Sequence, residues 1–382
     1  MRHSGPDVSS GYNPGPLLPS GREVADPPVP VRALRTVGRI REALAPVARD
    51  VLAEAMFRSG LTRPPRAART LLTVVAFHRV LPEAAFREYP ISPIAVSDVE
   101  FVWLVDFFRR NYTCGTLAEI HRRWVADEDP GLPFLAITFD DGQLDNHEHA
   151  LPVLDRARMK ASFFVPVDAV DGNTPLWHDQ FGYAARRLLA SDRPSALQLL
   201  AEVGVEGGTE DDALVLAAVE RSKRLPSAAR LDLVGRLAAA AGSPRPEWDG
   251  IMSWDQLRDL ARGGHEVGSH SVTHAILTQV EDAQLEREVR HSRDRIRSEL
   301  GVPCESFCYP NGDCDERVAA AVRRGGYLRA VTTAWGTNPP GADPFRLRRC
   351  DVPSARVRDR GGRLSEPRVA FRMSRLHPGP RP

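Results

Sequence analysis

The sequence has few cysteines, almost no lysine and no long run of apolar residues. Lysine occurs only at Lys160 and Lys223, so arginine carries nearly all of the positive charge. The cysteines are odd in number and irregularly spaced, which excludes a disulfide framework and a Cys-x-x-Cys metal site. We expect them to be reduced and mostly buried. They are Cys114, Cys304, Cys308, Cys314 and Cys350.

Two further absences concern location and partners. The longest apolar runs are far too short to span a membrane, and residues 1–30 lack the apolar core of a signal peptide. We therefore expect a cytoplasmic protein. The net charge of +1 gives no reason to expect nucleic acid as a partner. The oligomeric state cannot be predicted from these features.

The N-terminal part of the chain precedes the main domain. Residues 1–32 are rich in proline and are expected to be a disordered tail. Residues 33–70 comprise a predicted amphipathic helix, over about 33–59, and a short basic linker. We expect this helix to pack against the main domain. Peripheral binding to a membrane surface is the alternative, because basic amphipathic helices can lie on lipid.

Residues 71–353 show the pattern of an α/β domain. Near-continuous apolar strands, the first at 71–77, alternate with helical segments, as in parallel sheets that are covered on both faces. Within this domain, residues 180–246 have helical periodicity and no strand signal, which predicts a helical insertion. Residues 354–382 are basic and loop-like and are expected to form a C-terminal tail.

Two adjacent carboxylates follow one of the predicted buried strands. Asp140 and Asp141 come after the apolar run at 135–137, and Gly142 follows directly. Neighbouring residues of a strand point to opposite faces, so both acids can serve one site only where the strand ends and turns. An acidic turn that closes the strand is the alternative interpretation.

Two histidines follow a second predicted strand. His270 and His274 are four residues apart, a spacing that lets both face one divalent metal from one helical turn. The carboxyl ends of parallel strands are where such folds build their sites. We therefore predict a metal site formed by the histidines and one aspartate. On zinc such a site keeps an open position for water, and the second aspartate is free to act as general base.

A third polar segment is the Tyr-Pro-Asn-Gly run at 309–312, which predicts a tight turn after a strand. Its backbone amides could bind an oxyanion. A plain turn is the alternative.

The segments at 138–142, 270–274 and 309–312 resemble the first three motifs of the polysaccharide deacetylase (NodB homology, carbohydrate esterase 4) family. Other segments, near Trp177 and Met252, are similar to bacterial members associated with exopolysaccharide biosynthesis. The resemblance implies a distorted (β/α)7 barrel and metal-dependent removal of acetyl groups from N-acetylated sugars.

The resemblance also implies roles for individual residues. Asp140 would be the base, and Asp141, His270 and His274 would hold the metal. We expect Zn²⁺, with Co²⁺ or Ni²⁺ as alternatives.

The sequence departs from the family pattern at two places. Cys308 stands near the position of an arginine that pairs with the base, and Arg348 or Arg349 is the candidate substitute. The histidine expected near the C-terminal end as general acid is absent. His78, which ends the first predicted strand, is the candidate, because histidine can protonate an amine near neutral pH. The alternative is a histidine that is hydrogen-bonded to a loop.

The segment at 177–179 is the candidate substrate-binding segment, together with the turn at 309–312. An aromatic ring could stack on a sugar, and the two polar side chains could bind hydroxyl groups, whereas the alternative is a loop anchor. The residues concerned are Trp177, His178, Asp179, Tyr309, Pro310, Asn311 and Gly312.

The sequence therefore predicts a metal-dependent deacetylase of N-acetylated oligo- or polysaccharides. Two alternatives remain open: a metal-dependent amidase acting on a non-sugar amide or cyclic imide, and a catalytically silent glycan-binding relative. The identity and length of the sugar are not predicted.

Overall fold

The computed structural model describes residues 47–62 and 70–377. The predicted disordered tail, the first part of the predicted amphipathic helix and the linker at 63–69 lie outside the described residues. Residues 47–58 form a helix that ends just before Gly60. Across the two described ranges, no helix combines the length and the apolar character needed to cross a membrane.

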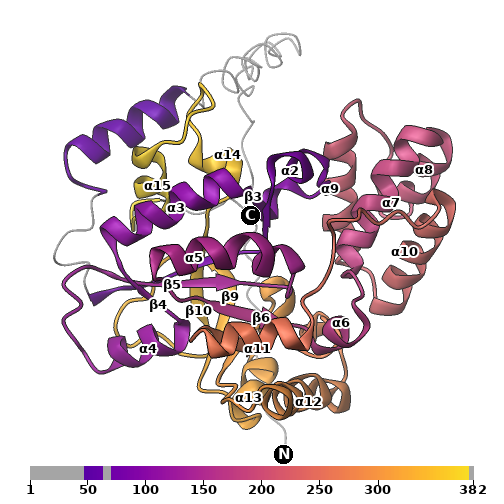
Figure 1. Cartoon of the computed structure of the whole chain (residues 1–382). Coiled ribbons are helices and arrows are strands. Elements are labelled where there is room, and N and C mark those ends of the chain that lie inside the picture. Colours follow the sequence, from indigo (N-terminus) through magenta and orange to yellow (C-terminus); the bar gives the residue numbers. More distant parts are fainter. Residues whose placement is uncertain (1–46, 63–69, 378–382) are drawn as a thin grey trace, which may run out of the picture. The chain divides into compact units, whose positions relative to one another are not determined.

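Seven parallel strands close into a barrel (Figure 1). Their order is β1-β10-β9-β8-β7-β6-β5, and β5 pairs back with β1 over its whole length. A short strand, β4, pairs with the beginning of β5. The predicted α/β fold, a distorted (β/α)7 barrel, is confirmed. The strands are β1 (Leu72–Phe77), β4 (Thr113–Gly115), β5 (Phe134–Phe139), β6 (Ser162–Val165), β7 (Glu266–Ser269), β8 (Ser306–Cys308), β9 (Arg329–Trp335) and β10 (Leu347–Asp351).

Alternate residues of the strands face the inside of the barrel. Val74 and Ala136 belong to an inner apolar cluster to which six of the barrel strands contribute. Because side chains alternate with a period of two, His78 and Asp140 continue the same inward row just beyond the ends of β1 and β5. The alternation therefore brings two polar side chains to the mouth of the barrel, at the carboxyl ends of its strands.

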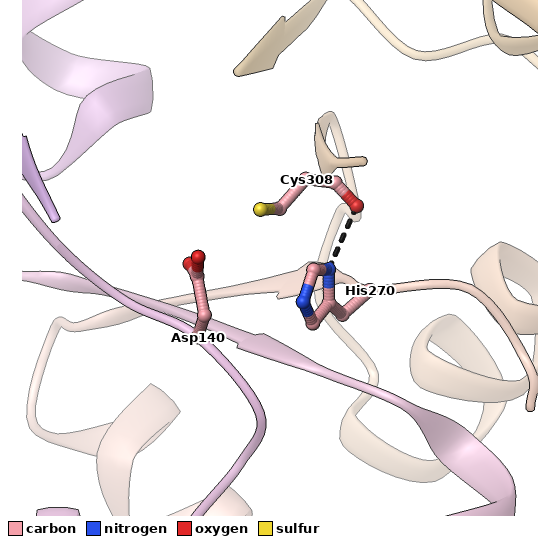
Figure 2. A group of neighbouring side chains, drawn as sticks. All are labelled: Asp140, His270 and Cys308. Atoms are coloured by element: carbon pink, nitrogen blue, oxygen red, sulfur yellow. Dashed lines mark hydrogen bonds between the residues drawn. The ribbon is translucent and has the colours of Figure 1, made fainter. Parts of the chain in front are cut away.

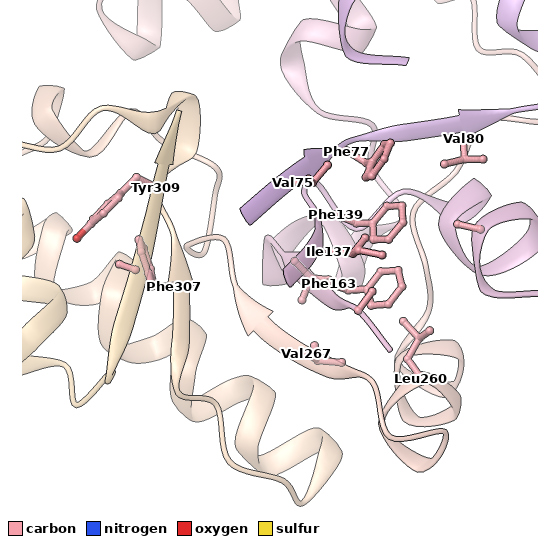
Figure 3. Packing of buried hydrophobic residues seen from close by; sticks show 14 of the residues in the cluster. Val75, Phe77, Val80, Ile137, Phe139, Phe163, Leu260, Val267, Phe307 and Tyr309 are labelled. Carbon is pink, nitrogen blue, oxygen red and sulfur yellow. The ribbon is translucent and has the colours of Figure 1, made fainter. Parts of the chain in front are cut away.

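The outward-facing residues of the same strands form the main core with the surrounding helices. Phe139 stacks between Phe77 and Phe163, with ring centroids 5.5 and 4.8 Å away (Figure 3). Phe101 of the covering helix meets Phe77 edge-on. This aromatic layer is completely buried and fixes the strand that carries Asp140.

Helices surround the barrel, and a small two-stranded sheet of β2 (Arg79–Leu81) and β3 (Ala95–Ser97) extends it. Besides the helix at 47–58, the α-helices of the described ranges are α2 (Glu83–Glu88), α3 (Asp98–Asn111), α4 (Leu117–Val125), α5 (Leu151–Ala157), α6 (Val167–Gly172), α7 (Trp177–Ser191), α8 (Arg193–Ala201), α9 (Asp211–Ser222), α10 (Ser227–Ala241), α11 (Trp254–Arg262), α12 (Asp282–Leu300), α13 (Glu316–Arg324), α14 (Ser354–Val357) and α15 (Glu366–Arg372). Short 3-10 or π turns are η2 (Ser92–Ile94), η3 (Asn146–Ala150), η4 (Leu277–Gln279) and η5 (Pro310–Gly312).

Helices α7 to α10 occupy the region of the predicted helical insertion (Figure 1). They have an apolar core of their own, which includes Phe181, Leu188, Val215 and Leu237. Tyr89, which precedes the barrel strand β5 in the sequence, is part of the same core. The insertion is therefore packed onto the segment that follows β2.

The interpretation of residues 354–382 as a loop-like tail is wrong for the residues up to 377. Helices α14 and α15 lie there, and Val357, Val369 and Met373 are buried in the main core. The guanidinium of Arg358 also binds Glu100 of α3 at 2.6 Å. The many arginines of this segment hid its few buried apolar residues from a reading of composition.

Candidate metal centre and catalytic residues

Asp140 and Asp141 both reach the mouth of the barrel because the chain turns between them. The amide of Asp140 still donates to the carbonyl of Phe77 at 2.9 Å, so Asp140 continues β5. Asp141 has a left-handed backbone, with φ of 73°. This conformation is costly for a residue with a Cβ and is typical of functional sites. Both carboxylates are almost completely buried.

Asp141 faces two imidazoles. Its Oδ1 atom lies 3.3 Å from Nε2 of His270 and 3.3 Å from Nε2 of His274. Among the described residues this buried oxygen has no hydrogen-bond partner. One carboxylate oxygen and two imidazole nitrogens within 4.8 Å of one another are a suitable donor set for a divalent metal such as zinc. The residues present therefore fit the metal that the sequence predicts.

The orientation of His270 is fixed by a hydrogen bond at Nδ1, the ring nitrogen that does not face Asp141. Its Nδ1 donates to the carbonyl of Cys308 at 2.8 Å (Figure 2). This leaves Nε2 for Asp141, whose Oδ1 lies 3.3 Å away. A backbone carbonyl on the far nitrogen is the usual support of a metal-binding histidine, because it sets the tautomer. Burial lowers the pKa of His274 to about 4, so this imidazole is neutral and able to bind a cation.

The two histidines do not lie on a helix, and that prediction was wrong. His270 follows β7 directly, and the next residues form a loop in which Ser271 and His274 have left-handed backbones. The buried carboxylate of Glu288 accepts hydrogen bonds from the amides of Val272 and Thr273 at 2.8 and 2.9 Å. Glu288 thus satisfies amides that a helix would use internally.

Sequence reasoning missed Glu288. It lies on the inner face of α12 beside Leu285 and Val289, where an acidic residue stands out in an otherwise apolar row. That break in the row was the available signal.

Arg349 of β10 binds the carboxylate of Asp140 through both terminal nitrogens of its guanidinium, Nη1 and Nη2. The two contacts measure 2.8 Å to Oδ1 and 2.7 Å to Oδ2. The same guanidinium donates to the carbonyl of Thr332 and contacts the sulfur of Cys308 at 3.4 Å. Burial raises the pKa of Asp140, but the charge and hydrogen bonds of Arg349 outweigh it and lower that pKa to about 2. Asp140 is therefore held as a carboxylate.

His78 also lies beside Asp140. Its Nε2 is 3.7 Å from Oδ2 of Asp140, and a quarter of its side chain is exposed. Burial lowers the pKa of His78, although both aspartates oppose this shift. The position is suitable for exchanging a proton with a molecule in the pocket.

His178 approaches the second oxygen of Asp141. Its Nε2 lies 3.5 Å from Oδ2, whereas the other two histidines face Oδ1, and its ring centroid is 5.7 Å from that of His274. This nitrogen is buried and has no hydrogen-bond partner among the described residues. Burial lowers the pKa of His178, but Asp179 and Asp141 outweigh it and raise that pKa. His178 is placed to orient Asp141, and it also lines the pocket.

The interpretation of Asp179 as a residue that binds hydroxyl groups is contradicted, because Asp179 is completely buried. It accepts hydrogen bonds from Tyr89 at 2.6 Å and from Gln143 at 3.0 Å, and it pairs with Arg79 at 3.3 Å. This contact set anchors the first turn of α7, and hence the neighbouring His178.

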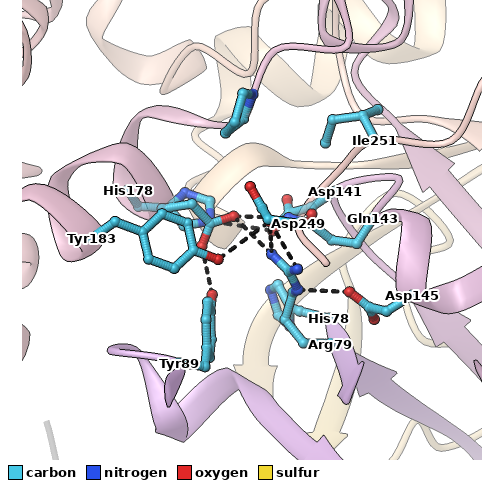
Figure 4. A network of polar contacts seen from close by, with 12 residues as sticks. His78, Arg79, Tyr89, Asp141, Gln143, Asp145, His178, Tyr183, Asp249 and Ile251 are labelled. Atoms are coloured by element: carbon cyan, nitrogen blue, oxygen red, sulfur yellow. Dashed lines mark hydrogen bonds and ion pairs between the residues drawn. The ribbon is translucent and has the colours of Figure 1, made fainter. Parts of the chain in front are cut away.

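Arg79 is the centre of this network. It is fully buried and binds Asp145 at 2.7 Å and Asp249 at 2.9 Å in addition to Asp179 (Figure 4). Its guanidinium also lies over the rings of Tyr89 and Trp248. We refer to Arg79, Tyr89, Asp145, Asp179 and Asp249 as the Arg79 cluster. It joins the strand after His78 to the start of the helical insertion.

In the turn after β8, fewer backbone amides are free to bind an oxyanion than the sequence suggests. The amide of Tyr309 donates to Val331, and that of Gly312 donates to Tyr309. Pro310 has no N–H, so Asn311 holds the remaining amide for an oxyanion. Gly312 has φ of 81°, and a Cβ there would overlap the side chain of Thr333. The hydroxyl of Tyr309 donates to the carbonyl of Phe345, so it is already used.

All of the predicted site residues except Asp179 and Pro310 line one small pocket of about 110 Å³. Trp177 lines it and is mostly buried, with one ring face covered by the guanidinium of Arg230 at 4.8 Å. A larger cavity of about 830 Å³ lies beside His121 and Trp124 and contains none of the residues described above. The small pocket is lined by His78, Ile91, Ile94, Asp140, Asp141, Trp177, His178, Val219, Lys223, His270, His274, Ile276, Tyr309, Asn311, Gly312, Thr333 and Arg349.

The fold and this cluster define a parallel α/β barrel with a candidate metal site at the carboxyl ends of its strands. A sequence profile described as Polysaccharide deacetylase matches residues 127–209 and 222–330, half of the chain. The chain belongs to this family. A search among curated protein sequences gives no match.

One solved structure shows the same barrel. The Streptococcus pyogenes deacetylase PplD in complex with acetate is 15% identical, with a TM-score of 0.51, over 74% of this chain and 92% of that one. IcaB from Ammonifex degensii is 19% identical, with a TM-score of 0.48, over 74% and 91%. At these identities the likeness to PplD establishes the fold, and the site of the present chain rests on its own residues.

Proposed function

We propose that this protein is a metal-dependent deacetylase that removes acetyl groups from N-acetylated sugar residues of an oligo- or polysaccharide. The observation that carries the proposal is the division of labour between adjacent carboxylates. Asp141 faces His270 and His274, whereas both oxygens of Asp140 are bound by Arg349. Family membership and the resemblance of neighbouring segments to exopolysaccharide-associated members support the substrate class.

Asp141, His270 and His274 would hold the metal, and Zn²⁺ suits their donors best, with Co²⁺ or Ni²⁺ as alternatives. When bound, the cation supplies polarisation of the amide carbonyl and a lowered pKa of water. His178, against the second oxygen of Asp141, keeps that carboxylate in one orientation.

The remaining steps belong to the chain itself. Asp140, ionised beside Arg349, accepts the proton of the attacking water. The amide of Asn311 stabilises the developing oxyanion, because it is the turn's remaining N–H. His78 then donates a proton from Nε2 to the departing sugar amine.

The alternative of a silent glycan-binding protein depended on a missing arginine and a relocated histidine. Arg349 and His78 both lie against Asp140, so those two departures no longer favour it. No contact in the pocket favours a cyclic imide over an acetamido sugar.

The test is release of acetate from defined N-acetylated oligosaccharides, with and without a chelator, beside a panel of cyclic imides and small amides. We expect acetate release from the oligosaccharides that stops with chelator and returns with Zn²⁺. Hydrolysis of the imides alone, or saccharide binding without acetate release by the metal-loaded protein, would contradict the proposal.

A further inference from the structure

The helical insertion contributes a cation to the rim of the pocket. Val219 of α9 and Lys223, at its C-terminal end, line the same pocket as Asp140 and Asp141. Lys223 is one of only two lysines in the chain, and the other, Lys160, does not line this pocket. A permanent positive charge therefore stands at the pocket on an element outside the barrel.

The backbone that carries Lys223 is fixed to the site. Its carbonyl accepts hydrogen bonds from Gln279, in the segment after the two histidines, at 2.9 Å and from Arg230 at 3.5 Å. The same Arg230 lies over the ring of Trp177, which precedes His178. Both contacts tie the end of α9 to segments that line the pocket, so the position of Lys223 relative to the pocket is set.

The ammonium of Lys223, in contrast, is held only loosely. Its partner is Glu220 at 2.6 Å, whose side chain is 72% exposed. Such an exposed pair contributes little to stability, so a better anion can replace it. The pocket's other permanent cation, Arg349, is already neutralised by Asp140. Of the cations that line the pocket, Lys223 is thus the one available to a substrate.

We propose that the substrate carries an anionic group, a phosphate or a carboxylate, on the acetamido sugar or on the neighbouring residue, and that Lys223 binds this group. The inference rests on the proposed function and makes it more specific. A lysine suits the task because its ammonium acts as a compact point charge on a flexible stem. Attraction at the rim of a partly apolar pocket is screened less than in open solvent.

The experiment uses the metal-loaded protein and compares three trisaccharides as substrates. They are neutral N,N′,N″-triacetylchitotriose, the same sugar with a phosphate, and the same sugar with a carboxylate. The readout is the ratio of kcat/KM for each anionic sugar to that for the neutral one. We expect Lys223→Ala to lower this ratio about tenfold, mainly through KM, which is the equivalent of about 1.4 kcal/mol. Lys223→Arg should retain most of it, and the matched control Lys160→Ala should keep the wild-type ratio.

The two anionic sugars separate the possible sources, because loss with only one of them identifies phosphate or carboxylate as the recognised group. An unchanged ratio in Lys223→Ala, with an unchanged melting temperature, would overturn the inference. If the wild type releases no acetate from any sugar, the proposed function fails, and calorimetric binding of the same sugars decides the inference separately. A preference for the anionic sugars that disappears in Lys223→Ala supports it, and equal binding of all three refutes it.

Discussion

Arg79 and Arg349 are two of the buried arginines that bind carboxylates in this protein, and they differ in how completely they are surrounded. Arg79 is surrounded on all sides: three aspartates bind it and two aromatic rings cover it. Arg349 binds the single carboxylate of Asp140, and on the open side of that carboxylate lies the pocket with His78. One arrangement is closed, and the other has an open face.

The comparison shows why burial and charge alone do not identify a site. Removing a partner of a closed network leaves an unpaired charge, which costs stability. In the Arg79 cluster, the buried atoms that make no hydrogen bond each face an opposite charge: Arg79 Nε and Asp145 Oδ2 lie 2.7 Å apart, and Asp249 Oδ2 lies 3.4 Å from Nε of Arg245. In the pocket that Arg349 lines, in contrast, Asp141 Oδ1 and His178 Nε2 are buried without hydrogen-bond partners among the described residues, and Asp141 Oδ1 faces two imidazoles at 3.3 Å. Native proteins rarely leave buried polar atoms unpaired, so such atoms mark a place for a ligand. The two regions should therefore respond to mutation in opposite ways.

The largest effect is expected for Asp140→Asn. The amide keeps the shape but cannot accept the proton, so we expect acetate release to fall by about 10²–10⁴-fold. Because Asp140 is bound by Arg349 through both oxygens and is not one of the three residues that we assign to the metal, bound zinc measured by atomic absorption should remain stoichiometric. Activity near the wild-type level would remove Asp140 from the role of base.

The next effect concerns metal binding. Asp141, His270 and His274 supply one metal-binding atom each, and His274→Ala removes one of the three. The affinity for zinc should therefore fall by more than about 100-fold. Titration with a chromogenic chelator measures it directly. His291→Ala, on the exposed face of α12, is the matched control. Full zinc occupancy in His274→Ala would refute the donor assignment.

Arg349→Lys should have an intermediate effect. Lysine keeps the charge but cannot bind both oxygens of Asp140, so kcat/KM should fall by up to about 10²-fold. The arginine opposes the effect of burial and lowers the pKa of Asp140 to about 2. Weakening it raises that pKa, and the acid limb of the pH–rate profile should move to higher pH. Arg348→Lys, on the exposed neighbouring residue, should leave the limb in place.

These predictions depend on residues that sequence reasoning could identify to different degrees. Asp140, Asp141, His270 and His274 lie in short segments whose spacing carries the signal. Arg349 has no such signal, because it is 209 positions from Asp140 in the sequence. The two side chains come into contact only when the barrel closes. Arg348 and Arg349 were equal candidates until the alternation along β10 placed Arg349 inward.

The fold could be predicted where apolar runs were long, as for β1 and β5. Strand β10 was missed because its sequence, Leu-Arg-Arg-Cys-Asp, contains two arginines. Arginines in a sequence are normally expected to be exposed, whereas Arg349 is buried against Asp140. The short helices after residue 353 were missed for the same reason, since Arg368 and Arg372 there are also buried.

The smallest effect on activity is expected in the closed Arg79 cluster. Tyr89→Phe removes the hydroxyl that donates to Asp179 at 2.6 Å. A hydrogen bond to a buried charge contributes about 1–3 kcal/mol, so the free energy of unfolding should fall by that amount in urea denaturation. Asp179 keeps its contacts with Arg79 and Gln143, so the start of α7 and His178 stay in place and activity should change by less than about threefold.

If Tyr89→Phe instead lowered activity as strongly as Arg349→Lys while leaving stability unchanged, the Arg79 cluster would be part of the catalytic machinery. The contrast between the closed and the open arginine would then be wrong.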